Sequence, residues 1–266
     1  MALDPWGKTG MLRALIFDVD GTLADTESVH LAAFNHAFAE FGLDWRWDEA
    51  QYTVLLNIAG GKERILHYWR TTQPQLREAD AMAMQDTVNR LHELKTAAYA
   101  AAVNGGAVSL RPGVLRLMGE ALVQGLRLAI ATTTSPVNIA ALLRHAMGPD
   151  WRRNFAAIGD ASNAPLKKPH PQVYLNMLAA LQRAPAACLA FEDSSNGLQA
   201  ASAAGLATVI TPTRYTAQHD FSDALRVLPD LGAVDLAQLR SWHRPGKKRD
   251  TGARAMSRLN ARTEPT

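Results

Sequence analysis

The chain has 266 residues, 47% of them hydrophobic, which is enough for one large α/β domain or for a core with a modest second domain. Its single cysteine, Cys188, excludes an intramolecular disulfide and indicates a reducing compartment. No apolar stretch approaches the ~18 residues of a membrane span, and the first ten residues lack the apolar segment of a signal peptide. We therefore expect a cytoplasmic protein with no membrane partner.

The net charge of +3 is unevenly distributed along the chain. Residues 240–266 carry eight basic and two acidic side chains, a net charge of +6, which leaves −3 for the rest. This segment is poor in apolar residues, so we expect residues 239–266 to form a disordered basic tail. A solvated tail is favoured over one that binds polyanions, and no nucleic-acid partner is expected.

The first predicted element is a buried strand that ends in two aspartates, within the run of residues 15–23. A near-continuous apolar run is typical of a parallel strand, and ligands of open α/β sheets bind at the carboxyl ends of such strands. A turn at Gly21 lets the two carboxylates divide the chemistry, with Asp18 as nucleophile and Asp20 as general acid and base. The alternative is that both aspartates only form turns or cap a helix.

The next block, residues 25–104, shows helical spacing of its apolar residues and no convincing strand. His30, Phe34 and Phe38 illustrate this three-and-four spacing. The block predicts an all-helical insert that ends in a glycine hinge at residues 104–106.

After the hinge, strands and helices alternate. Helices are predicted at 111–122, up to 142, at 171–181 and at 197–204, and strands at 126–131, 155–159, 188–191 and 207–210. This alternation predicts a doubly wound, Rossmann-like parallel sheet in an α/β fold, with helices on both faces.

Polar groups suited to a phosphate follow two of these strands. Thr132, Thr133 and Thr134 end a strand in hydroxyls, and at a helix start their backbone N–H groups can also hold phosphate oxygens. Lys168, beside Pro169, places an ammonium group where it can neutralise both a phosphoryl group and Asp18. The alternatives are ordinary helix caps and a solvated lysine.

Another strand end carries Glu192 and Asp193. Mg²⁺ prefers one or two carboxylates together with waters and substrate phosphate. We therefore predict a Mg²⁺ site formed by Asp18, Asp20, Glu192 and Asp193, in which Asp193 binds the ion directly and Glu192 acts through water or by supporting the direct ligands. The alternative is that Asp193 is merely a helix N-cap.

Together these motifs resemble those of the haloacid dehalogenase superfamily. Residues 18–22 resemble its first motif, Thr132 its second, Lys168 its third and residues 192–193 its fourth. The resemblance spans residues 12–228 and implies a phosphotransferase that forms an aspartyl phosphate with Mg²⁺. The helical insert is similar to the caps of one subclass, so the chain is expected to divide into a core at 11–24 and 105–238 and a cap at 25–104.

Within that subclass, residues 44–48 and 60–65, with His92, Lys95 and Thr96, resemble the CbbY phosphatases. The resemblance implies a phosphatase of xylulose 1,5-bisphosphate in the Calvin cycle, which removes a by-product that blocks Rubisco. β-Phosphoglucomutase is similar in residues 25–26 and in His30.

The cap also carries candidate groups for a substrate with a second phosphate. Lys62 and Arg64 follow a glycine pair where the backbone can approach a ligand, and Lys95 lies on a later helix. Glu27 can accept hydrogen bonds from sugar hydroxyls, and His30 can position Asp20. The full predicted substrate-binding set is Thr26, Glu27, His30, Gly60, Gly61, Lys62, Glu63, Arg64, His92, Lys95, Thr133 and Thr134.

The alternative is that this set has no binding role: the charged residues can be solvated helix ends, and Glu27 and His30 can be simple surface residues. The aromatic residues Trp45, Trp47, Tyr52 and Trp69 are interpreted as the core of the cap and not as a sugar platform.

We expect a monomer that acts on a small sugar phosphate. The alternatives are a β-phosphoglucomutase-like mutase, a phosphatase of another small ester such as phosphoglycolate, a catalytically silent binding module, and a nucleic-acid binder that uses its basic tail.

Overall fold

The computed structural model describes residues 11–72 and 81–243. Its core is a parallel six-stranded sheet in the order β3-β2-β1-β4-β5-β6. The strands are β1 (Ala14–Phe17), β2 (Arg127–Ala131), β3 (Ala157–Gly159), β4 (Cys188–Glu192), β5 (Ala207–Ile210) and β6 (Arg226–Val227).

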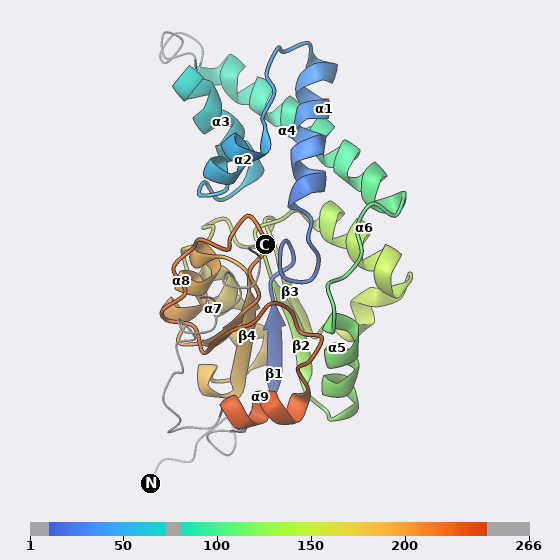
Figure 1. Ribbon diagram of the computed structural model, residues 1–266, viewed down its shortest axis with the longest axis vertical. Helices are drawn as coiled ribbons and strands as arrows, with labels where there is room; N and C mark the ends of the chain where they lie inside the picture. Colours follow the sequence, from blue (N-terminus) through green and yellow to red (C-terminus); the bar gives the residue numbers. More distant parts are fainter. Residues whose placement is uncertain (1–10, 73–80, 244–266) are drawn as a thin grey trace, which may run out of the picture.

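The helices form two groups (Figure 1). One group forms a cap above the sheet, and the other packs on the two faces of the sheet. The cap helices are α1 (Glu27–Phe41), α2 (Glu49–Leu55), α3 (Gly61–Thr72) and α4 (Ala81–Asn104). The core helices are α5 (Val114–Val123), α6 (Pro136–Met147), α7 (Gln172–Leu181), α8 (Ser195–Ala203) and α9 (Leu236–Trp242). The cap thus enters the chain directly after the first strand, as predicted.

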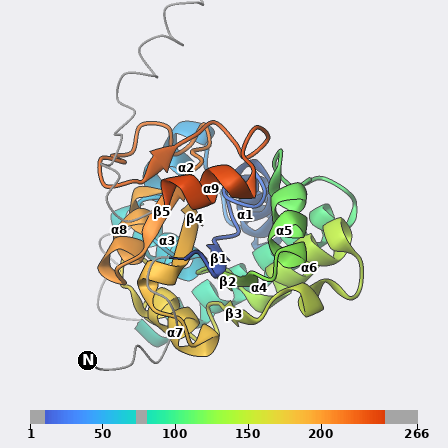
Figure 2. The same ribbon diagram turned by 90° about the horizontal axis from the view of Figure 1, so that it is seen from below.

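Helices cover both faces of the sheet (Figure 2). Alternate residues of β1 point to opposite faces: Leu15 and Phe17 pack with α5, α6 and α9, and Ala14 and Ile16 pack with α7 and α8. All four side chains are fully buried. The apolar run of the sequence therefore reflects a strand with no solvent-facing side, and the doubly wound fold is confirmed.

The position of β1 fixes where its aspartates lie. It is the third strand of the sheet, and Phe17 pairs with Ile130 of β2 on one side and Phe191 of β4 on the other. The chain turns to opposite sides of β1 for these two strands, so the topological switch lies between β1 and β4. Because all strands are parallel, the residues that follow β1, β2 and β4 meet at one edge, beneath the cap.

Aromatic packing holds the cap together. Trp47 and Tyr52 are buried against Phe34 and Phe38 of α1. The ring centroid of Phe34 lies 4.8 Å from that of Trp47 and 6.1 Å from that of Tyr52. Trp45 and Trp69 are partly buried against the same cluster. The interpretation of the cap aromatics as core is confirmed. The cluster also contains Tyr215, which comes from the loop after β5 and belongs to the other domain.

The structure departs from the predicted elements in three places. Strand β3 begins at Ala157, because Phe155 ends a 3-10 turn and packs against Trp151. Strand β6 and helix α9 were not predicted. The expectation of a disordered tail from residue 239 is wrong at its start, since Leu239 is fully buried in α9. The rest of that expectation, at 244–266, lies outside the described residues.

Within the described ranges, no helix is both long and apolar enough to span a lipid bilayer. Cys188 is buried and free.

Candidate active site

Asp18 follows β1 directly and is held by strand β4 and by Lys168, which lies between β3 and α7. Its backbone N–H donates to the carbonyl of Phe191 at 3.0 Å, which continues the pairing with β4. Its carboxylate accepts a hydrogen bond from Lys168 Nζ at 2.6 Å. Lys168 also donates to the carbonyl of Ala131 at 2.8 Å and to Glu192 Oε1 at 2.5 Å. The lysine therefore joins the ends of β1, β2 and β4 into one buried centre.

Three carboxylates share this centre, and together they fit a divalent cation. Asp18, Glu192 and Asp193 are all buried, and one ligand oxygen of each lies within 4.8 Å of the others. The buried Glu192 Oε2 has no hydrogen-bond partner in the described part of the chain. A single lysine cannot balance three buried carboxylates, and Mg²⁺ takes hard oxygen ligands of this kind. The residues present thus fit the predicted Mg²⁺ site.

Two glycines let the backbone approach these acids. At Gly21, which has a φ of +78°, an added Cβ would lie 2.2 Å from Asp193 Oδ2. At Gly197, near the start of α8, it would lie 1.9 Å from Glu192 Oε2. Any side chain at either position would displace a carboxylate, so the glycines are part of the site's geometry. Asp193 itself is not the N-cap of α8, because Ser194 accepts that hydrogen bond from Gly197.

Burial and like charges set the protonation of the acidic centre. Burial raises the pKa of Asp18 to about 7, opposed by the ammonium of Lys168 and reinforced by Glu192. Burial and the neighbouring Asp18 and Glu192 raise the pKa of Asp193 well above its usual range. For Lys168, burial works against the charged form, but Asp18 and Glu192 outweigh it and raise its pKa. The ammonium is therefore charged at every physiological pH.

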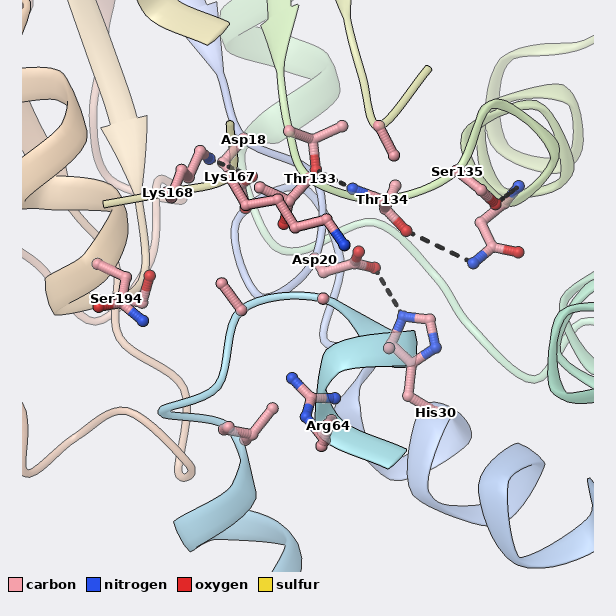
Figure 3. A pocket seen from close by; sticks show the side chains of 18 of the residues that line it. Asp18, Asp20, His30, Arg64, Thr133, Thr134, Ser135, Lys167, Lys168 and Ser194 are labelled. Atoms are coloured by element: carbon pink, nitrogen blue, oxygen red, sulfur yellow. Dashed lines mark hydrogen bonds and ion pairs between the residues drawn. The ribbon is translucent and has the colours of Figure 1, made fainter. Parts of the chain in front are cut away.

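Asp20 faces the cap and not the acidic centre (Figure 3). Its Oδ1 accepts hydrogen bonds from Thr26 Oγ1 at 2.7 Å and from His30 Nε2 at 3.0 Å. Lys95 Nζ lies 2.8 Å from His30 Nδ1 and can only donate, so the ring proton sits on Nε2, toward Asp20. The Asp20 carboxylate lies outside the group formed by Asp18, Glu192 and Asp193, so a part for Asp20 in metal binding stays a prediction.

These cap contacts keep Asp20 ionised. Burial alone would raise its pKa, but the interaction with His30, the hydrogen bond from Thr26 and the charge of Lys95 outweigh burial and lower it. Burial lowers the pKa of Lys95 to about 8. His30 thus positions Asp20, as predicted from the sequence, and Lys95 positions His30 and does not point freely into the cavity.

The hydroxyl run after β2 forms the opposite wall. Thr132 is buried, and its Oγ1 accepts a hydrogen bond from the N–H of Thr134 at 3.3 Å. Ser135 is the N-cap of α6 and accepts from Asn138. The helix cap is therefore Ser135, and Thr132, Thr133 and Thr134 line the cavity with hydroxyls and the start of a helix.

Arg64 is anchored by the cap that carries it. Its Nε donates to the carbonyl of Leu55 at 3.0 Å, and its Nη1 donates to the hydroxyl of Tyr52 at 3.2 Å. Tyr52 in turn donates to Glu27 Oε2 at 2.7 Å. Glu27 and Arg64 thus line the cavity as a fixed pair of acceptor and cation, with the tyrosine hydroxyl between them.

A second group of charged and polar side chains lines the cavity where the cap meets the core. Lys62 donates to Asn89 Oδ1 at 2.8 Å on α4, and Lys167 pairs with Glu63 Oε2 at 2.5 Å, a contact that joins the core to the cap. Burial, with the charges of Lys95, Lys62 and Lys167, lowers the pKa of His92 to about 4, so this imidazole is neutral at pH 7. Gly60 lies beneath the ion pair and Gly61 beneath His92.

These residues surround one cavity of about 480 Å³ between cap and core. It contains every predicted site residue except Thr26 and Glu63, which contact Asp20 and Lys167 from behind. The structure adds groups that sequence motifs did not indicate: Tyr174, whose hydroxyl donates to Glu192 Oε1, and Ser194, Asn196 and His219 on the cavity wall. The apolar spacing of α7 conceals Tyr174, so no sequence signal marked it.

Comparison with known proteins decides the family. The family model described as haloacid dehalogenase-like hydrolase matches residues 12–205. The plasmid-encoded protein CbbY of Cupriavidus necator is 53% identical over 248 residues, which cover 87% of this chain and 97% of that protein. This chain is a haloacid dehalogenase-like hydrolase of the CbbY type. Like that family, it is a phosphoric monoester hydrolase.

Solved structures agree with this assignment. A crystal structure of a CbbY variant from Rhodobacter sphaeroides in complex with xylulose 1,5-bisphosphate is 40% identical, covers 86% of this chain and 99% of that one, and has a TM-score of 0.78. A β-phosphoglucomutase from Clostridium difficile shares the fold, with a TM-score of 0.71 at 20% identity. The predicted family and fold class are confirmed.

Proposed function

We propose that this CbbY-type phosphatase hydrolyses xylulose 1,5-bisphosphate with Mg²⁺, through an aspartyl phosphate on Asp18, and serves the Calvin cycle. The observation that carries the proposal is the pairing of a buried Asp18–Lys168 centre with a second set of cations across the same cavity. The relative crystallised with this bisphosphate supports the choice of substrate.

The first step is attack of an Asp18 carboxylate oxygen on phosphorus, which breaks the bond to the sugar oxygen. Lys168 and the hydroxyls after β2 hold the phosphoryl oxygens, so charge is stabilised where it develops. Mg²⁺ held by Asp18, Asp193 and Glu192, directly or through water, would neutralise the phosphoryl group and keep Asp18 ionised despite its raised pKa.

Asp20 handles the protons of both steps. In the arrangement seen here it is ionised and bound to Thr26 and His30, which suits the removal of a proton from the water that attacks the aspartyl phosphate. To protonate the leaving sugar oxygen, it must first take up a proton and turn from the cap toward Asp18. Cap closure over the substrate would exclude bulk water during this exchange.

The second phosphate and the sugar hydroxyls are assigned to the cap side of the cavity. Arg64 and Lys62 offer cationic donors, while Glu27 and the neutral His92 can hydrogen-bond to hydroxyls. A monophosphate would leave these cations unpaired and should bind more weakly. The cavity of about 480 Å³ suits a small sugar bisphosphate.

The test is a phosphate-release assay on a matched panel. Xylulose 1,5-bisphosphate should give the highest kcat/KM, above ribulose 1,5-bisphosphate, phosphoglycolate and β-glucose 1-phosphate, and Asp18→Asn should abolish release from each. A preference for phosphoglycolate would overturn the assignment of the substrate. Production of glucose 6-phosphate from β-glucose 1-phosphate and its bisphosphate activator, with little free phosphate, would identify a mutase instead.

A further inference from the structure

Arg111 ties together three segments that meet at the active site. It lies where the chain returns from the cap to the core, and its own N–H donates to the carbonyl of Leu23 at 2.8 Å. The adjacent Leu110 forms an isolated antiparallel bridge with Ala24. This return segment therefore lies directly beside the loop of residues 18–24, which carries both catalytic aspartates.

The guanidinium of Arg111 is bound almost entirely to backbone carbonyls. Nη1 donates to the carbonyl of Gly21 and to the carbonyl of Thr211 at 2.5 Å, with the Thr211 hydroxyl at 3.3 Å. Nη2 donates to the carbonyls of Pro212 at 3.0 Å and Pro229 at 2.8 Å. Only the rigid five-donor fork of arginine can reach four carbonyls at once, and the single point of a lysine ammonium cannot.

The Gly21 carbonyl is the contact with catalytic consequences. Gly21 follows Asp20 directly, and its α-carbon faces the Asp193 carboxylate so closely that no Cβ fits between them. A shift of this carbonyl moves Gly21, and with it the backbone to which Asp20 is directly joined and the distance between the loop and Asp193. Strand β1 fixes Asp18 by regular pairing, but Asp20 lies in the turn beyond that pairing.

The other carbonyls belong to the segment that reaches the cap. Thr211 and Pro212 begin the loop after β5, and three residues further on Tyr215 is buried in the aromatic cluster of the cap, 6.1 Å from Tyr52 between ring centroids. Beside it, Arg214 pairs with Glu49 of α2 at 3.2 Å. One arginine thus connects the Asp20 turn to the loop on which the cap rests.

We propose that Arg111 is a positioning residue for hydrolysis: by holding the Gly21 carbonyl against the root of the 211–216 loop, it keeps Asp20 in place relative to the cap and the phosphoryl group. The inference rests on the proposed role of Asp20 in proton transfer. It does not depend on which sugar phosphate is the substrate.

The test compares Arg111→Lys with a matched control, Arg116→Lys. Arg116 also donates to backbone carbonyls, those of Leu231 at 3.0 Å and Val234 at 2.6 Å, but these lie in the turn before α9. A merely structural arginine should affect only melting temperature, as we expect for Arg116→Lys. Arg111→Lys should lower kcat by about 10- to 100-fold, with KM changed less than about threefold, as for a small misplacement of a reacting group.

Two further measurements make the inference specific. In an Asp20→Asn background, Arg111→Lys should slow turnover by no more than about twofold, because residues that act through one another are not additive. If Arg111→Lys does not fold, Thr211→Val, which removes only one hydroxyl acceptor, should show the same pattern at about two- to fivefold. The assays use p-nitrophenyl phosphate as well as xylulose 1,5-bisphosphate.

The outcomes separate the two proposals. An unchanged kcat in Arg111→Lys, or an equal loss in the Asp20→Asn background, would overturn the role of Arg111. Wild-type turnover of p-nitrophenyl phosphate without turnover of the bisphosphate would overturn only the proposed substrate.

Discussion

Replacing Lys168 by methionine tests the electrostatic core of the site. The change keeps most of the side-chain volume but removes the ammonium that donates to Asp18, Glu192 and the carbonyl of Ala131. Breaking a buried ion pair by removing one partner costs about 3–5 kcal/mol, because the remaining charges stay buried without compensation. Phosphate release should fall at least about a thousandfold, since both the phosphoryl clamp and the ionised nucleophile are lost.

The stability loss should depend on pH in a defined direction. The folded-state pKa of Asp18 is raised from 3.8 to about 7, so between these values the native state holds a proton that the unfolded state has lost. Stability from this group is therefore present at low pH and falls as pH rises through that window. Without Lys168 the pKa of Asp18 rises further, so the variant should lose about 3–5 kcal/mol at about pH 8 but only about 1–2 kcal/mol at about pH 5.5.

Urea unfolding at both pH values, without divalent cations, measures this difference. Lys167→Met is the matched control, because Lys167 is the adjacent lysine and forms a partly exposed ion pair with Glu63, which is expected to contribute only about 0–1 kcal/mol. Equal stability of Lys168→Met and the wild type at about pH 8, or a larger loss at low pH, would refute the reasoning.

Three other predictions follow from the same geometry. Asp18→Asn should reduce phosphate release below about 1% of wild type without lowering the melting temperature, since it removes a buried charge; retained turnover of a few per cent would contradict a nucleophilic Asp18. Chelation should abolish activity, and Mg²⁺ at about 100 times its Kd should raise the free energy of unfolding by about 2.7 kcal/mol, a gain that Asp193→Asn should lose in calorimetry. Thr26→Val should lower the free energy of unfolding by about 1 kcal/mol at neutral pH, because it removes a hydrogen bond to the ionised Asp20 carboxylate. The pKa of Asp20 is lowered in the folded state, so this stabilisation is lost as pH falls through the acid range. A difference in the free energy of unfolding that persists in strong acid, measured by chemical denaturation, would argue against this role.

Much of this protein could be predicted from the sequence, because its chemistry lies at strand ends. The apolar run before Asp18 marks a strand buried on both faces, and the same pattern precedes Thr132 and Glu192. In a parallel sheet, carboxyl ends share one edge, so the nucleophile, hydroxyls and acids had to meet. The helical insert could be predicted because its apolar residues follow helical three-and-four spacing, whereas the strand before it is a continuous apolar run.

Elements without such a period escaped prediction. Strand β6 has two residues and exists only because β5 offers it an edge. Helix α9 carried a readable signal, the capping box of Asp235 and Gln238, but it lies next to a basic segment that dominated the composition.

Only the tertiary structure decided how the side chains share the site. The direction of the Asp20 side chain depends on His30, which lies 10 residues away in the chain. His30 is held in turn by Lys95, which lies a further 65 residues along. The carbonyls bound by Arg111 likewise come from segments 90 to 118 residues away. Local sequence fixes which strand a residue ends, whereas contacts between distant loops fix which atom it faces, and such contacts leave no period or spacing in the chain.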